Sequence, residues 1–201
     1  MKQQVVVIHG GDSFPAYDAY LSYLKNFKVD SIDSFRPKKD WKTSLPETLG
    51  GEYDVLLPRM PNKNNARYLA WKLWFEKMIP FLNDEVILVG HSLGASFLVH
   101  YLSEEQFPRR IRATLLVAAP YSIDMGAGTT PEFTAPDSLA LLEKQGGKIL
   151  LYHSKDDLVV PFSELAKYQK ALPSATARAF NDRQHFNQES FPELVADIQS
   201  L

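Results

Sequence analysis

The sequence predicts an α/β protein with a doubly wound, mostly parallel sheet of about six strands and helices on both faces. The first observation is that short runs rich in Val, Ile and Leu recur along the chain, and most are continuous rather than alternating, as in strands buried on both faces. The second is that helical patterns lie between these runs. The third is size, because 201 residues, 45% of them hydrophobic, suffice for a single domain spanning residues 1–201 with a substantial core.

Each expected element has its own segment. The strands are expected at 4–10, 53–58, 85–90, 113–120, 148–154 and, with a weaker pattern, 175–180. The helices are expected at 64–82, 93–104, about 137–145, 161–172 and 191–201. Residues 28–52 are expected to hold one short helix before Gly50, and residues 121–136 to form a loop after a strand. Right-handed crossovers bring the carboxyl ends of parallel strands to one edge of the sheet, where ligands bind.

Composition and charge exclude several classes of function. The net charge of −2 and the pI of about 6.2 come with no basic stripe for a nucleic acid. The chain contains no cysteine, so disulfides, thiolate catalysis and cysteine-based zinc sites are excluded. The first residues are too poor in apolar side chains for a signal peptide, and no apolar run approaches the roughly 18 residues of a membrane span. A cytoplasmic protein, monomeric or a small homo-oligomer, with no membrane partner is the default expectation.

The most informative motif is Gly90-His91-Ser92-Leu93-Gly94, which follows an expected strand and precedes an expected helix. G-x-S-x-G in that context is typical of a nucleophile elbow, a tight turn that exposes a reactive serine. Side chains at the two glycine positions would collide with the neighbouring strand and helix. The alternative is an ordinary glycine-rich turn in which Ser92 caps the helix.

The order of residues along the chain tests this interpretation. A reactive serine needs a histidine base, which needs an orienting carboxylate, and after this elbow the acid precedes the histidine. Of the five histidines, only His185 lies in a loop after a strand and downstream of both the serine and a plausible acid. The acid is expected after the preceding strand, where Asp156 and Asp157 are adjacent and one of them is expected only to form a turn.

The oxyanion formed during acyl transfer needs two hydrogen-bond donors. The backbone N–H of Leu93 is the first candidate, because Leu93 follows the nucleophile. The second is expected from His9-Gly10-Gly11 after the first strand, and Gly11 is preferred over Asp12 because glycine lets a ligand approach the backbone closely. The chain has no dinucleotide fingerprint, phosphate-binding loop or H-E-x-x-H motif, so neither a cofactor nor a metal is expected.

Several motifs occur together. They are HGG at 9–11, PRMPN at 58–62, GHSLGA at 90–95, DDLVVP at 156–161 and HFN at 185–187. With this combination the chain resembles the α/β-hydrolases, and more narrowly the small serine hydrolases of the YdeN and retinoblastoma-binding protein nine type, from residue 4 to about residue 198. The resemblance implies a minimal α/β-hydrolase fold without a large cap, which disfavours long-chain lipid substrates. It also implies an acid four residues before a proline, which here favours Asp157 before Pro161.

The leading hypothesis is therefore a serine hydrolase that cleaves small carboxylic esters or thioesters through an acyl-enzyme on Ser92. Large apolar side chains near the expected strand ends are candidates for its acyl pocket, although core packing is an equal alternative for each. They are Phe14, Met60, Tyr121, Phe133, Phe162 and Phe186. Two other hypotheses stay open, a binding protein on a hydrolase fold with weak or vestigial activity, and a peptidase or amidase.

Overall fold

The computed structural model describes residues 2–122 and 130–201, and its core is a parallel sheet. The strands are β1 Gln3–Ile8, β2 Tyr53–Leu56, β3 Val86–His91, β4 Ile111–Val117, β5 Lys148–Ser154 and β6 Thr176–Phe180. They pair in the order β2-β1-β3-β4-β5-β6, and every neighbouring pair is parallel. The predicted fold class is confirmed. The strand order reverses between β1 and β3, which is the point in such sheets where a crevice opens.

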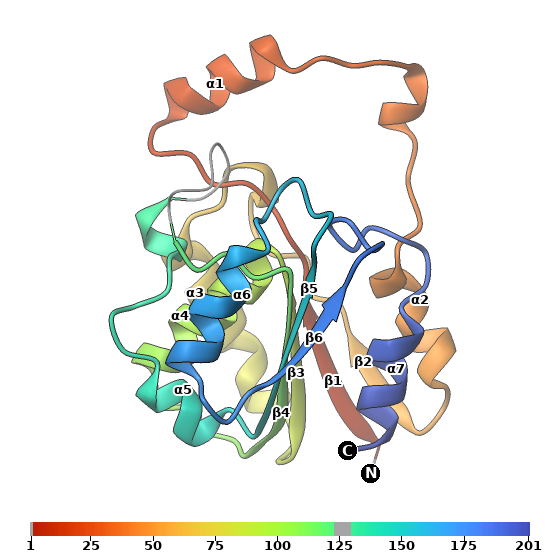
Figure 1. Ribbon diagram of the computed structural model, residues 1–201, viewed down its shortest axis with the longest axis vertical. Helices are drawn as coiled ribbons and strands as arrows, with labels where there is room; N and C mark the ends of the chain where they lie inside the picture. The colour runs from red at the N-terminus through yellow and green to blue at the C-terminus, as the bar shows by residue number, and fades with distance from the viewer. Residues whose placement is uncertain (1, 123–129) are drawn as a thin grey trace.

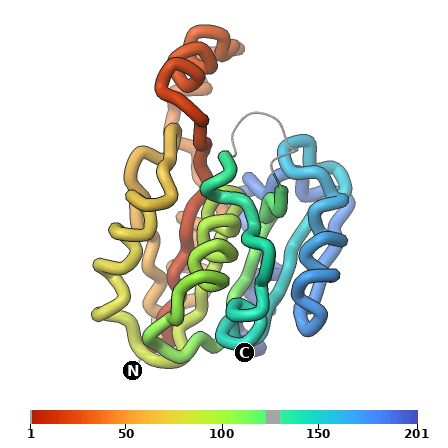
Figure 2. The backbone as a smooth tube through the Cα atoms, turned by 90° about the vertical axis from the view of Figure 1, so that its left-hand side faces the viewer, coloured from red at the N-terminus to blue at the C-terminus, as the bar shows by residue number. Residues whose placement is uncertain are grey.

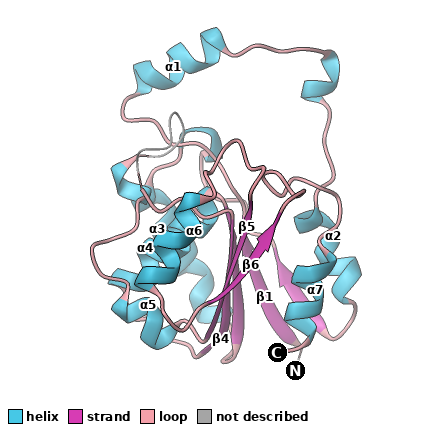
Figure 3. Cartoon of the chain, viewed as in Figure 1, coloured by secondary structure: helices cyan, strands magenta, loops and turns pink. Residues whose placement is uncertain are grey.

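Helices cover both faces of the sheet (Figures 1 and 3). On one face lie α3 Tyr68–Met78, α4 Leu93–Glu104, α5 Ala140–Gln145 and α6 Ser163–Ala171, and on the other lie α2 Trp41–Leu49 and α7 Pro192–Gln199. Alternate residues of β1 enter different cores, because Val6 and Ile8 pack with the first group of helices and Val5 and Val7 with the second. Both faces of the central strands are buried, which explains their continuous apolar sequences.

The helix predicted at 64–82 is divided into three pieces. A 3₁₀ turn η2 at Lys63–Asn65 precedes α3, and a second, η3 at Ile79–Phe81, follows it. Pro80 lies within η3 and has no N–H for the α-helical bond, so the chain tightens there. The short helix predicted before Gly50 is α2, which ends at that glycine with φ of 77°.

Helix α2 begins at a capping box that the sequence analysis did not identify. The Asp40 carboxylate accepts from the backbone N–H of Thr43 at 3.0 Å, and the Thr43 hydroxyl oxygen accepts from the N–H of Asp40 at 3.2 Å. Each side chain satisfies a donor that the start of a helix leaves without a partner. The box fixes the start of α2 and with it the positions of Trp41 and Lys42.

Helix α1, Tyr17–Asn26, was not predicted. Together with the 3₁₀ turn η1, Ile32–Phe35, it lies beyond the carboxyl edge of the sheet and apart from the other helices (Figures 1 and 2). None of its residues is buried, so no apolar face is held against the core.

The loop predicted at 121–136 is described only at its two ends. Residues 123–129 lie outside the described residues, and Pro131–Phe133 forms the 3₁₀ turn η4. Among the residues that the structure describes, no helix combines the length and the apolar character that a membrane span requires.

Candidate active site

Ser92 lies in the turn between β3 and α4. Its φ of 54° and ψ of −122° place a non-glycine residue in a strained backbone region. A Cβ atom on Gly90 would lie 2.5 Å from the Cα of Ala95, and one on Gly94 would lie 2.3 Å from the carbonyl oxygen of Ile8. The turn therefore requires both glycines. The Ser92 side chain makes no capping hydrogen bond to α4, which disfavours the alternative of a helix-capping serine.

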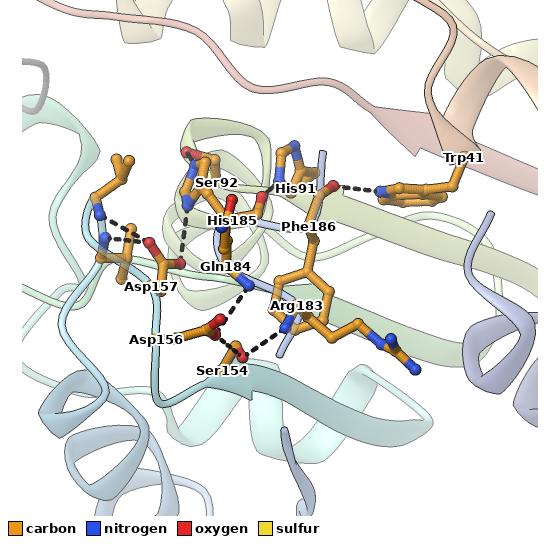
Figure 4. Close-up of polar contacts among 12 residues, drawn as sticks. Trp41, His91, Ser92, Ser154, Asp156, Asp157, Arg183, Gln184, His185 and Phe186 are labelled. Carbon is orange, nitrogen blue, oxygen red and sulfur yellow. Dashed lines mark hydrogen bonds and ion pairs between the residues drawn. The ribbon is translucent and has the colours of Figure 1, made fainter. Parts of the chain in front are cut away.

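The side chains of Ser92, His185 and Asp157 form one hydrogen-bonded chain (Figure 4). The Nε2 atom of His185 lies 3.0 Å from the Oγ atom of Ser92. The Nδ1 atom of His185 lies 2.9 Å from the Oδ2 atom of Asp157. A carboxylate only accepts, so Nδ1 carries the proton and Nε2 is available to accept the serine proton.

Only one of the two adjacent aspartates contacts the His185 ring. The side chain of Asp157 is 0% exposed, and its Oδ1 atom accepts from the N–H groups of Val159 at 2.8 Å and Val160 at 2.9 Å. These bonds orient the carboxylate toward the ring. The Asp156 carboxylate instead accepts from the hydroxyl of Ser154, which holds the pKa of Asp156 below its ordinary value, and from the N–H of Gln184 at 2.9 Å.

The loop after β1 lies beside Ser92. A Cβ atom on Gly10 would lie 3.2 Å from the Cβ of Ser92, and one on Gly11 would lie 2.2 Å from the carbonyl oxygen of Lys63. The N–H of Asp12 donates to that same carbonyl at 2.8 Å, so it has an acceptor already. Of the two candidates in this loop, Asp12 is thus the less suitable donor.

The ring of His9 holds this loop in place. Its Nε2 atom accepts from the N–H of Met60 at 2.9 Å, so its Nδ1–H donates to the carbonyl oxygen of Gly10 at 2.7 Å. Burial lowers the pKa of His9 and keeps the ring neutral, as both hydrogen bonds require. The other candidate donor is Leu93, the first residue of α4, whose N–H has no acceptor within the helix.

A cavity of about 350 Å³ opens beside Ser92. Its other lining residues are His9, Gly10, Gly11, Asp12, Asp40, Lys42, Lys63, His91, Leu93, Pro120, Val159, Val160, His185 and Asn187. Lys42 reaches it from α2 and pairs with Asp40 at 2.7 Å. Burial lowers the pKa of Lys42, and the bond to Asp40 partly opposes that effect. The sequence analysis missed these charged walls, because only a short helix before Gly50 marked this segment.

The six predicted pocket residues do not line this cavity in the described part of the chain. Met60, Phe133 and Phe186 are almost fully buried in the cores beside the sheet. Phe14 is also buried and contacts the ring of Tyr23, at 5.1 Å between centroids. Tyr121 and Phe162 are half-buried and pack against the core on the α6 side. Five of the six side chains thus lie in a core or pack against one, which is the alternative that was considered for them.

Solved structures with the same fold include hydrolases. The ydeN gene product from B. subtilis superposes with a TM-score of 0.72 at 20% identity, over 99% of this chain and 98% of that one. A putative yden-like hydrolase from Pectobacterium atrosepticum gives a TM-score of 0.63 at 15% identity, over 99% and 90% of the two chains. At these identities the likeness shows the fold, and the predicted resemblance to YdeN is confirmed.

Comparison of sequences goes further. Serine hydrolase RBBP9 from Rattus norvegicus is 27% identical over 152 residues, which are 74% of this chain and 78% of the relative. The sequence profile of the serine hydrolase family matches residues 35–194, a span that includes Ser92, Asp157 and His185. The chain therefore belongs to the serine hydrolase family.

Proposed function

We propose that this protein hydrolyses small carboxylic esters or thioesters through an acyl-enzyme formed on Ser92. The observation that carries the proposal is the continuous contact from the Ser92 hydroxyl through His185 to Asp157, at 3.0 and 2.9 Å. In this assignment Ser92 is the nucleophile, His185 the general base and acid, and Asp157 the group that orients the ring. The N–H groups of Leu93 and Gly11 bind the oxyanion.

The reaction proceeds in two halves. The Ser92 oxygen attacks the acyl carbon, its proton moves to Nε2 of His185, and the carbonyl electron pair becomes the oxyanion. When this intermediate collapses, the bond to the leaving oxygen or sulfur breaks, and Nε2–H protonates the leaving group. A water molecule then attacks the acyl-enzyme and passes its proton to Nε2. Collapse breaks the acyl bond to Ser92, returns the proton to it and releases the carboxylic acid.

The cavity supports a small substrate. Its volume of about 350 Å³ is near the lower end of the usual range for ligand sites. Leu93, Pro120 and Val159 provide apolar surface for a short acyl or alcohol group, whereas Lys42 and Asp40 make another part of the wall polar. The membership of the serine hydrolase family supports a small-molecule substrate as well.

A panel of p-nitrophenyl esters from acetate to octanoate, with a matching thioester, tests the proposal. We expect turnover to be highest for the short acyl chains, and a fluorophosphonate probe to label the folded wild type at Ser92. Replacement Ser92→Ala removes the attacking oxygen, so kcat is expected to fall by roughly 10⁴-fold or more and labelling to disappear. If the folded wild type neither turns over any ester nor reacts with the probe, the proposal is wrong, and the alternative of a binding protein gains support.

A further inference from the structure

The backbone on both sides of His185 adopts an unusual conformation. Gln184 has φ of 46° and Phe186 has φ of 54°, both in the left-handed region. Side chains disfavour this region, and neither residue is a glycine or an asparagine. Such a conformation persists only where surrounding groups hold it. The groups that hold these two residues therefore determine where the His185 ring points.

On the amino-terminal side, the loop is bound by the end of β5 and the turn after it. The Oγ atom of Ser154 accepts from the N–H of Arg183 at 3.1 Å. The carboxylate of Asp156 accepts from the N–H of Gln184 at 2.9 Å. The hydroxyl of Ser154 donates to that carboxylate, so the two side chains hold each other as well as the loop (Figure 4).

On the carboxyl-terminal side, the loop is bound from α2 and β3. The indole Nε1–H of Trp41 donates to the carbonyl oxygen of Phe186 at 2.8 Å, and the backbone N–H of Trp41 donates to Gln188 at 2.8 Å. The Nε2 atom of His91 lies 2.8 Å from the carbonyl oxygen of His185. Trp41 is 2% exposed and packs against the ring of Phe191, so its indole cannot turn away without opening the core.

We infer that Asp156 and Trp41 are positioning residues, which hold the two left-handed residues beside His185 and thereby keep its ring opposite Ser92. Each binds one of the two, since Asp156 accepts the N–H of Gln184 and Trp41 donates to the carbonyl of Phe186. Without either partner, the loop is free to relax to ordinary backbone angles, and the ring moves with it. The inference rests on the proposed function of Ser92 and His185.

Kinetics on paired variants test this role. Replacement Asp156→Ala removes the acceptor, so we expect kcat to fall by about 10- to 100-fold while KM changes little. Asp156→Asn keeps a side-chain oxygen that accepts from Gln184, and it is expected to restore most of kcat. Trp41→Phe removes the indole N–H but keeps an aromatic ring, and kcat is expected to fall by about 10-fold. Thermal unfolding of each variant checks that the fold is retained.

The comparison of kcat with the melting temperature separates positioning from general stability. In Asp156→Ala and Trp41→Phe, kcat is expected to fall at a temperature where each variant is fully folded, because the ring of His185 has moved away from Ser92. A side chain that only stabilised the fold would lower the melting temperature and leave kcat of the folded variant unchanged.

A measurement without substrate keeps the inference separate from the proposed function. The proton shared by His185 and Asp157 is expected to give a slowly exchanging, downfield NMR signal in the wild type, and to exchange faster in Asp156→Ala and Trp41→Phe. Ester turnover by the wild type is not needed for this comparison. Unchanged kcat and an unchanged NMR signal in both folded variants would overturn the inference. An effect of Asp156→Asn as large as that of Asp156→Ala would also overturn it, because an accepting oxygen would then not suffice.

Discussion

The turn around Ser92 and the loop around His185 are both strained, but they are held in different ways. At Ser92 the strain is accommodated locally, because Gly90 and Gly94 have no side chains, and side chains at these positions would collide with α4 and with β1. The loop at His185 contains no glycine, and its left-handed residues are bound by side chains from α2 and from the turn after β5. One half of the site is thus a local motif, and the other half depends on distant parts of the chain. Trp41, for example, is 145 residues from Phe186 in sequence.

The largest expected effect comes from breaking the contact between His185 and Asp157. This contact joins the loop around His185, the histidine loop, to the turn after β5. Asp157→Asn places an amide where the carboxylate accepts from Nδ1 of His185, and this favours the wrong tautomer of the ring. We expect kcat for a p-nitrophenyl ester to fall by roughly 10³- to 10⁴-fold, with the fold retained.

The adjacent aspartate provides the control for this variant. Asp156→Asn keeps an accepting oxygen beside Gln184 and is expected to retain most of kcat. Equal losses in the two asparagine variants would contradict the assignment of separate roles to the two carboxylates. A loss confined to Asp156→Asn would exchange the roles.

The next largest effect tests the elbow. In Gly94→Ala the new Cβ would lie 2.3 Å from the carbonyl oxygen of Ile8 and 2.5 Å from that of His9, so β1 and α4 have to separate. We expect the free energy of unfolding in urea to fall by about 3 kcal/mol. The control is Gly51→Ala, because a Cβ there meets no atom within 4 Å. If Gly94→Ala were as stable as Gly51→Ala, the local account of the elbow would be wrong.

The smallest expected effect is a pH-dependent loss of stability caused by His153, whose surroundings differ from those of His91. His91 in the elbow donates to the histidine loop, whereas the Nε2 atom of His153, just before Ser154, is buried without a partner among the described residues. Burial lowers the pKa of His153 to about 4, and Asp157 and Glu164 oppose that effect. Below about pH 6.5 the unfolded chain binds a proton at this residue that the folded chain does not, so stability falls as the pH falls toward 4.

Replacement His153→Leu removes this proton uptake. Urea unfolding at pH 7 and at pH 5 is expected to show that the wild type loses about 2 kcal/mol more stability than the variant over this interval. The variant retains His91, whose pKa burial also lowers, so the difference between the two proteins isolates His153. The same loss in both proteins would show that His153 does not govern this part of the acid sensitivity.

The turn around Ser92 could be predicted more fully than the loop around His185, because the first depends on local contacts and the second on contacts with distant parts of the chain. The motif around Ser92 was predicted together with the strand before it and the helix after it, from neighbouring residues alone. This was possible because its glycines are required by contacts with α4 and with the adjacent strand β1. His185 was selected by its order along the chain. The choice of Asp157 over Asp156 rested on a family resemblance, since two adjacent carboxylates look alike until their neighbours in space are known.

The predicted apolar pocket and helix α1 are two features that the sequence did not predict correctly. Phe133 and Phe186 were predicted near strand ends as pocket residues, but their rings are buried in the cores, and the cavity wall is built partly from Lys42 and Lys63. Helix α1 carries Tyr17, Tyr20, Leu21 and Leu24 at helical spacing, a pattern that the prediction did not use. None of its residues is buried, so this apolar stripe does not pack into the core.

The sequence by itself determined the parallel sheet, the family and the turn around Ser92, because hydrophobic runs, glycine spacing and residue order are properties of short or ordered stretches of chain. Only the tertiary structure decided which aspartate contacts the ring, which side chains line the cavity and what holds the left-handed residues beside His185. Those outcomes depend on where α2, β3 and β5 meet the histidine loop. Contacts between segments so far apart in sequence arise only when the sheet has assembled and the helices have packed on its faces.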